Sequence, residues 1–143
     1  MHRINWARIV RGGLIAGVVI NMRLVIAPRY YDGSWRGLLW ALKRLDGRTL
    51  LSFVVPGLVI GLCLLWVYAA IRARYGPGPT TAIRAGLAVW LISDLPLLMR
   101  LAFPYDRRPF VMVAVDLVLC AVAALVGAFF YQDAAPVPAH VSG

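Results

Sequence analysis

The chain has 143 residues, of which 62% are hydrophobic and only 15% are charged, and its mean hydropathy is +0.77. A soluble domain covers its surface with about 25% charged residues, so this composition excludes an ordinary soluble fold and predicts an integral membrane protein. The net charge of +9 does not indicate nucleic-acid binding. The basic residues flank apolar runs, where they would face anionic lipid headgroups.

Four apolar stretches reach the length of about 20 residues that a helix needs to cross a bilayer. They cover approximately residues 9–28, 50–71, 81–103 and 110–132. We therefore expect an all-α, polytopic membrane protein in which residues 1–132 form a single bundle of four transmembrane helices, with both termini on one side. Residues 133–143 have little to bury and are expected to form a flexible tail.

The first stretch is the least regular, because Arg11, Asn21 and Arg23 interrupt it. Its basic start and short apolar centre also fit a cleaved signal peptide. However, no small-x-small cleavage site follows, and Arg23 lies where the apolar region of a signal would end. We therefore expect a retained helix.

The loop after the first stretch contains "SWRGLLWALKRLDG", residues 34–47, whose large apolar side chains recur at helical spacing. This pattern predicts a short amphipathic helix in the plane of the membrane interface. Its role would be either lipid anchoring or docking on a partner subunit. The residues of its apolar stripe are Trp35, Leu38, Leu39, Leu42 and Leu45.

The segment "RARYGPGPTT", residues 72–81, separates the second and third stretches. Alternating Gly and Pro cannot continue a helix, because they remove backbone donors and helical dihedral angles. Thr80 or Thr81 is the expected N-cap of the next helix.

Charged residues occur at membrane depth in the first, third and fourth stretches. At 1.5 Å per residue, Arg23, Arg100 and Asp116 lie about 5–9 Å inside one boundary, and Asp94 lies about 13 Å deep, near the midplane. Membrane proteins tolerate such groups when they pair internally. The four charges sum to zero, so we predict that they form an intramembrane polar network together with the amide of Asn21. The members of this network are Asn21, Arg23, Asp94, Arg100 and Asp116.

Helical spacing indicates where two of these groups point. Asp116 shares a face with Cys120, Ala123 and Gly127, so it should point into the bundle. Arg23 lies about 200° round the helix from Asn21 and would either extend towards the headgroups or pair with Asp116, for which Arg100 is the other candidate partner. Pro96 should loosen the helix beside Asp94 by leaving a backbone carbonyl without its donor. The acids therefore have either a structural role, a proton- or ion-handling role, or a role in contacting another subunit.

Small residues four apart occur in three of the stretches and favour close helix packing in lipid. They predict packing contacts at Gly13 and Gly17, at Gly57 and Gly61, and at Ala123 and Gly127.

Three segments resemble a group of small, uncharacterised bacterial four-helix integral membrane proteins. They are residues 5–21, 66–90 and 115–131, and their most specific part is the turn "YAAIRARYGPGPTTA". Proteins of this group carry an acid early in the fourth span, which Asp116 matches. They also carry an acid shortly after the asparagine of the first span, where this chain has Arg23 and Leu24. The resemblance implies the four-helix architecture and a bacterial origin, and it implies no activity.

No catalytic motif is present: the sequence has no Gly-rich phosphate loop, no HExxH and no GxSxG. His2 and His140 are too far from the apolar stretches to ligate a haem, and Cys63 and Cys120 lie in apolar runs typical of packing residues. We therefore expect no enzymatic activity, no catalytic or metal site and no cofactor.

The expected function is that of a structural or accessory subunit in the bacterial inner membrane. Its partners would be the lipid bilayer and either another membrane subunit or a second copy of the chain. The alternatives are a small homo-oligomeric proton or ion transporter or channel that uses the intramembrane Asp residues, and a lipid-organising or membrane-stress protein.

Overall fold

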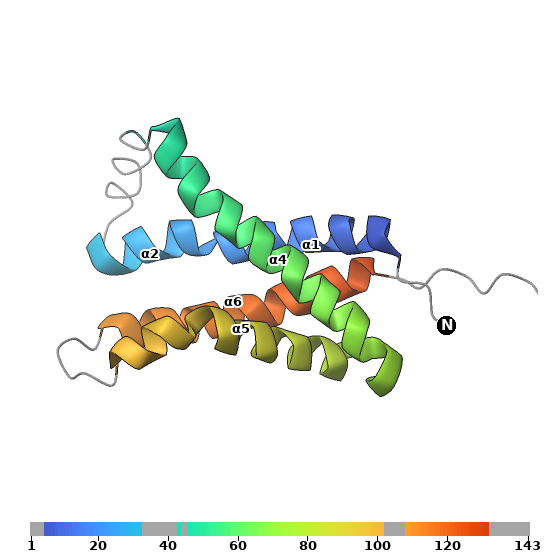
Figure 1. Cartoon of the computed structure of the whole chain (residues 1–143). Coiled ribbons are helices and arrows are strands. Elements are labelled where there is room, and N and C mark those ends of the chain that lie inside the picture. Colours follow the sequence, from blue (N-terminus) through green and yellow to red (C-terminus); the bar gives the residue numbers. More distant parts are fainter. Residues whose placement is uncertain (1–4, 33–42, 44–45, 102–107, 132–143) are drawn as a thin grey trace, which may run out of the picture.

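A computed structural model describes residues 5–32, 43, 46–101 and 108–131, and every regular element in these ranges is an α-helix. Side chains are described for most of these residues. The predicted interfacial stripe of Trp35, Leu38, Leu39, Leu42 and Leu45 and the predicted tail, 133–143, lie outside them. The helices are α1 (Trp6–Asn21), α2 (Arg23–Asp32), α4 (Gly47–Tyr75), α5 (Pro79–Leu101) and α6 (Arg108–Phe130) (Figure 1).

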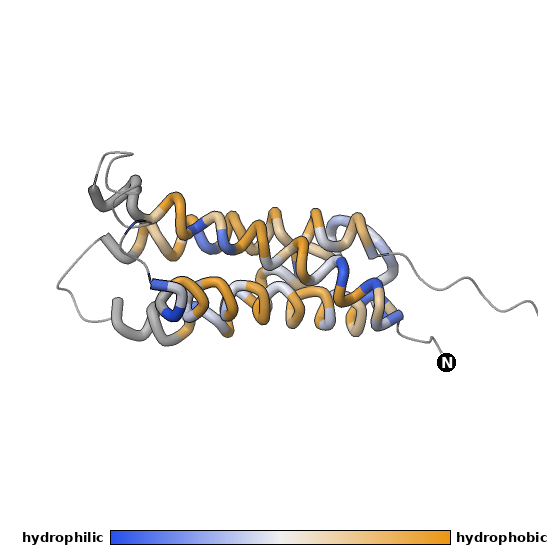
Figure 2. Tube along the Cα trace, turned by 90° about the horizontal axis from the view of Figure 1, so that it is seen from above, coloured by the Kyte–Doolittle hydropathy of each residue, from blue (hydrophilic) through white to orange (hydrophobic). Residues whose placement is uncertain are grey.

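Three segments of the described chain are long and apolar enough to cross a membrane. They are Trp6–Ala27, Leu50–Tyr75 and Phe110–Phe130. Hydrophobic residues cover most of the length of the helices (Figure 2). Many of their large apolar side chains face outwards, among them Trp66, Val118 and Phe129. Water would not tolerate so much exposed apolar surface, whereas lipid chains solvate it. The chain is therefore a helical protein with the character of a membrane protein.

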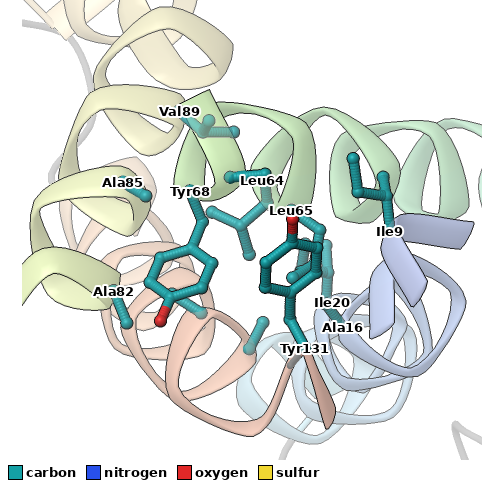
Figure 3. Packing of buried hydrophobic residues seen from close by; sticks show 13 residues of the cluster. Ile9, Ala16, Ile20, Leu64, Leu65, Tyr68, Ala82, Ala85, Val89 and Tyr131 are labelled. Atoms are coloured by element: carbon teal, nitrogen blue, oxygen red, sulfur yellow. The ribbon is translucent and has the colours of Figure 1, made fainter. Parts of the chain in front are cut away.

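The helices alternate in direction, so that the start of α1, the end of α4, the start of α5 and the end of α6 share one end of the molecule (Figure 1). α1 packs against α4 and α6, and α5 packs against the same two helices. α4 crosses α1 obliquely, and α2 continues roughly in line with α1 (Figure 1). Side chains from α1, α4, α5 and α6 meet in one hydrophobic core, which includes Ile9, Leu64, Leu65, Val89 and Ala123 (Figure 3).

The first apolar stretch forms two helices, where the sequence predicts one over residues 9–28. Asn5 caps α1, because its Oδ1 accepts a hydrogen bond of 3.3 Å from the backbone N–H of Arg8, so the helix begins before the apolar run. At the other end, Met22 alone separates α1 from α2. The N–H of Met22 donates to the carbonyl of Val19, at 3.1 Å. This bond spans three residues, as in a tighter 3₁₀ turn. Met22 nevertheless keeps right-handed helical dihedral angles, φ −58° and ψ −21°, and the two helices together form the single membrane-length segment Trp6–Ala27.

The other three helices cover the predicted apolar stretches but have different ends. α4 starts before residue 50 and continues to Tyr75, because backbone hydrogen bonding does not stop where the apolar side chains do. It also contains Pro56 without interruption. α5 begins at Pro79 and α6 at Arg108, each within two residues of the predicted boundary.

The turn between α4 and α5 is held by three hydrogen bonds. Gly76, at φ +80°, ends α4 in the left-handed conformation that glycine favours, and its N–H donates to the carbonyl of Arg72 at 2.9 Å. The hydroxyl of Thr81 donates to the carbonyl of Gly76 at 2.9 Å, and the N–H of Ala82 donates to the carbonyl of Gly78. Gly78 therefore precedes the helix, Pro79 occupies its first position, and the N-cap predicted at Thr80 or Thr81 is wrong.

Glycines let the backbones of α1 and α4 touch. A Cβ on Gly13 would lie 2.8 Å from the Cα of Leu62, and one on Gly17 would lie 2.7 Å from the Cα of Leu58. From the other side, a Cβ on Gly61 would overlap backbone atoms of Gly17 and Gly13. No side chain larger than a hydrogen atom fits at these points.

Two further contacts of small residues hold α6 in place. A Cβ on Gly12 of α1 would lie 2.9 Å from the carbonyl oxygen of Gly127, and Ala123 is fully buried. About two turns earlier along α6, a Cβ on Gly86 of α5 would lie 3.0 Å from the carbonyl oxygen of Cys120. α1 and α5 therefore each approach α6 through a glycine, as lipid-embedded helices do.

The glycine contact predicts the effect of a single methyl group. We expect Gly61→Ala to lower the free energy of unfolding by about 1–3 kcal/mol, because the added methyl forces α1 and α4 apart. Alanine has a higher helix propensity than glycine by about 0.8–1 kcal/mol, so propensity alone would stabilise the variant. Unfolding of the purified protein in detergent, followed by circular dichroism, measures the difference.

Gly47→Ala is the matched control, since nothing lies within 4 Å of a Cβ at that position of the same helix. It should be as stable as the wild type or more stable. A Gly61→Ala variant that matches the Gly47→Ala variant would show that α1 and α4 do not meet at this point.

Candidate functional site

An ion pair connects the start of α2 to α6. Arg23 Nη1 donates to Asp116 Oδ2 at 3.1 Å. The Asp116 side chain is 10% exposed, whereas the Arg23 side chain is 53% exposed. The arginine thus lies along the surface of the bundle and brings only the tip of its guanidinium group to a buried carboxylate. Long cationic side chains commonly lie in this way, with the apolar stem along an apolar surface and the charged group directed to a polar partner.

Asp116 is buried because of its position in the helical repeat of α6. Asp116, Cys120, Ala123 and Gly127 are all buried, and they lie three or four residues apart on one face of the helix. Gly127 lies against Gly12 of α1 and Leu65 of α4, and Ala123 belongs to the hydrophobic core. The close packing along this face therefore holds the carboxylate inside the bundle.

Asn21 connects α1 to α4 close to the ion pair. Its Nδ2 donates to the carbonyl of Val54, at 3.1 Å, and to the carbonyl of Gly17 in its own helix, at 2.9 Å. Space for the amide exists because residue 57 is glycine: a Cβ there would lie 2.5 Å from Asn21 Oδ1. Asn21 and Arg23 therefore point to different neighbours, the first to α4 and the second to α6.

Asp94 lies in α5 and is 6% exposed. Together with Arg23 and Asp116 it lines a cavity of about 60 Å³. One water molecule needs about 10–15 Å³ of such volume, so the cavity has room for a few. Among the side chains that the structure describes, Asp94 makes no salt bridge. The other residues that line the cavity are Ile20, Ile60, Ser93, Leu119 and Cys120.

The predicted polar network thus lies in two neighbouring places. Arg23, Asp94 and Asp116 share the cavity, while Asn21 bonds to the backbone of α4. The side chains of Pro96 and Arg100 lie outside the described set, so the position of Arg100 within this network stays a prediction. The α5 helix itself runs through Pro96 to Leu101 without a break.

Some residues at this site cannot be found from the spacing of charges. Ser93 and Cys120 line the cavity, and the Ser93 hydroxyl donates to the carbonyl of Trp90 at 3.1 Å. The indole Nε1 of Trp90 donates to the carbonyl of Val113 at 3.2 Å and so connects α5 to α6. A tryptophan inside an apolar run carries one donor that needs a partner, and this was the available signal.

The chemistry of the site is that of two carboxylates beside one guanidinium group, in a cavity large enough for water. When Asp94 and Asp116 are both ionised, they carry two negative charges, and the described Arg23 supplies only one positive charge. Such a site can hold a structural ion pair, and its second carboxylate can hold a proton or meet a monovalent cation. No group of three His, Cys, Asp or Glu residues placed to bind a metal ion occurs in the described ranges.

Comparisons with protein families, with curated proteins and with solved structures find no match to this chain. The resemblance to small bacterial four-helix membrane proteins therefore stays a prediction.

The ion pair predicts a specific pattern of stabilities. We expect Asp116→Asn to lower the free energy of unfolding by about 1.5–3 kcal/mol, the range for a lost hydrogen bond to a charged group. A fully buried pair would cost about 3–5 kcal/mol, but the exposed stem of Arg23 lets its guanidinium group turn to the headgroups. Chemical unfolding in detergent of Asp116→Asn, Arg23→Gln and the double variant gives the three values.

The double variant is the control for the pair itself. Its cost should be smaller than the sum of the two single costs, because both single changes remove the same contact. Single variants that are as stable as the wild type would exclude a structural role for the pair.

Proposed function

We propose that this chain is a structural or accessory subunit of the bacterial inner membrane, with four membrane-spanning helices and a short interfacial helix between the first and second. Membrane insertion is supported by the three apolar segments described above. The fourth span would be α5. Its 23 residues give a length of about 35 Å at 1.5 Å per residue, enough to cross a hydrocarbon core of about 30 Å.

The outer face of α5 supports its insertion. Leu87, Leu91, Ile92 and Leu95 are exposed there, while Asp94 on the inner face is buried. A helix with an apolar outer face and an inward acid suits a lipid environment better than an aqueous one.

A structural role is supported by one observation above the others: three of the predicted network residues, Asn21, Arg23 and Asp116, connect different helices. The pair of Arg23 and Asp116 connects α2 to α6, and Asn21 connects α1 to α4. Groups used in this way hold the helices in one arrangement and leave the outer surface to lipid or to a partner.

The test of an accessory role is the state of the protein in its native membrane. We expect gentle detergent extraction to release the chain in a complex with a second membrane protein at a fixed ratio, as measured by native mass spectrometry. The proposal would be contradicted if the 15.7 kDa chain were recovered only as a monomer at every detergent concentration that keeps it folded. A ring containing only copies of this chain would favour the homo-oligomeric alternative.

The cavity supports a second candidate, proton or monovalent cation transfer. Asp94 and Asp116 line the same small space, and Arg23 supplies one positive charge for the two of them. A proton relay in a membrane usually requires a carboxylate that no neighbouring cation neutralises.

Proton flux separates the two candidates. If the role is structural, vesicles that contain the purified protein should lose a pH gradient at the same rate as protein-free vesicles, as reported by an enclosed pH-sensitive dye. A faster rate that is lost in Asp94→Asn, and retained in the control Asp46→Asn at the exposed start of α4, would overturn the structural role in favour of transfer.

A further inference from the structure

A second cavity lies at the end of the bundle where α4 ends and α5 begins. Its volume is about 330 Å³, which is near the lower limit of small-molecule sites, about 300–1,000 Å³. It lies between the last turns of α4, the first turn of α5 and the end of α6. Its walls differ in character, with Tyr68 and Arg72 on one side, the turn of Pro77, Gly78 and Pro79 on another, and Leu125, Ala128 and Phe129 on a third.

The guanidinium group of Arg72 is held in place at this cavity. Arg72 Nη1 donates to the backbone carbonyl of Tyr131 at 3.3 Å. Its Cζ lies 5.4 Å from the centre of the Tyr131 ring and 5.9 Å from that of the Tyr68 ring. These rings are buried and meet edge to face at 5.9 Å (Figure 3). Each ring face attracts a cation, so the arginine is oriented before any ligand arrives.

The start of α5 adds to the positive potential of the cavity. Pro79 is the first residue of a helix of 23 residues, and Pro77, Gly78 and Pro79 all line the cavity. The N-terminus of a long helix carries a partial positive charge and attracts anions. The hydrogen bond from Thr81 to Gly76 fixes this turn, so the helix end and Arg72 keep their relative positions.

Positive side chains dominate this end of the molecule. The same end of the bundle as Arg72 also carries Arg8, Arg11, Arg74 and Arg84. No Asp or Glu occurs in the described residues 5–20, 65–86 and 124–131. The nearest acid in the sequence, Asp133, lies outside the described residues. The described part of this end is therefore complementary to an anion.

The third wall indicates what kind of anion fits. Leu125 and Phe129 are exposed on the outer face of α6, one turn apart, and Phe129 is 79% exposed. If α4 and α6 span a bilayer, this wall faces lipid chains while Arg72, one turn from the end of α4, is at headgroup depth. A ligand that touches both walls has an anionic head and an apolar chain.

We propose that this cavity binds the phosphate-bearing headgroup of an anionic membrane lipid, with Arg72 as the phosphate contact and a lipid chain against Leu125 and Phe129. A guanidinium group with a helix N-terminus beside it suits phosphate, which accepts several hydrogen bonds at once. Basic pockets between membrane helices bind lipid headgroups by this chemistry. The inference rests on the proposed membrane placement and is independent of a structural or accessory role.

Binding of labelled phosphatidylglycerol to the purified protein in neutral detergent tests the site. We expect Arg72→Gln to weaken binding about tenfold, the equivalent of one charge-assisted hydrogen bond. Arg72→Lys should recover part of the affinity, because it keeps the charge without the planar donors. The matched control is Arg74→Gln, an exposed arginine two residues away in the same helix, which should stay within about twofold of the wild type.

Three outcomes would overturn the proposal. Equal losses in Arg72→Gln and Arg74→Gln would show attraction by surface charge alone. Equal binding of labelled phosphatidylcholine, a lipid with no net charge, would show that the anion is not recognised. Displacement of the labelled lipid by inorganic phosphate at equal concentration would identify a free phosphate site.

A measurement on the wild type keeps the test valid if Arg72→Gln does not fold. A photoreactive phosphatidylglycerol in phosphatidylcholine vesicles should crosslink to peptides that contain residues 68–82 or 125–131. A photoreactive phosphatidylcholine should give no preference for those peptides. Crosslinks of the anionic lipid spread evenly along all the helices would contradict the proposed site, whatever the role of the protein in its membrane.

Discussion

The close contact of α1 with α4 is the constraint on which the rest of the structure depends. Gly13 and Gly17 lie against Leu62 and Leu58, and Gly61 lies against the α1 backbone, so nothing but hydrogen atoms separates the helices. The hydrophobic effect does little to bring helices together in lipid, and close packing must supply the attraction. The contact also sets the depth and rotation of α1. Asn21 consequently meets the carbonyl of Val54, and α2 starts where its arginine can reach α6.

The two ends of the molecule differ in where their acids lie: the described acids occur at one end beside basic residues, whereas the described part of the other end has arginines and no acid. Towards the first loop, Asp94 and Asp116 face one cavity and share one described cation, Arg23. At the other end, arginines line the helix ends, and Tyr68 and Tyr131 hold Arg72 beside a larger cavity. Charge in a bilayer must be paired, hydrated or brought to the headgroups. Asp116 is paired with Arg23, Asp94 faces a cavity with room for water, and the proposed membrane placement would bring the arginines of the other end to the headgroups.

Local patterns predict the helices and their buried faces, because these depend on neighbouring residues only. The all-helical fold is confirmed in the described ranges, and the predicted face of Asp116, Cys120, Ala123 and Gly127 is the buried face of α6. Other features need contacts between distant residues. The short turn at Met22 lies inside a run that reads as one apolar helix. The contact of Arg72 with Tyr131 joins residues 59 positions apart, and no spacing rule can pair them.

A double-mutant cycle between the helix contact and the ion pair tests most directly whether α1 packing positions the polar cluster. Asp116→Asn would be measured by chemical unfolding in the wild-type background and in the Gly61→Ala background. If the glycine contact aligns Arg23 with Asp116, the loss of the carboxylate should cost less in the Gly61→Ala background, with a coupling of about 0.5–3 kcal/mol. Two costs that add to within about 0.3–0.5 kcal/mol would show that the contact and the ion pair are independent, and would contradict this account.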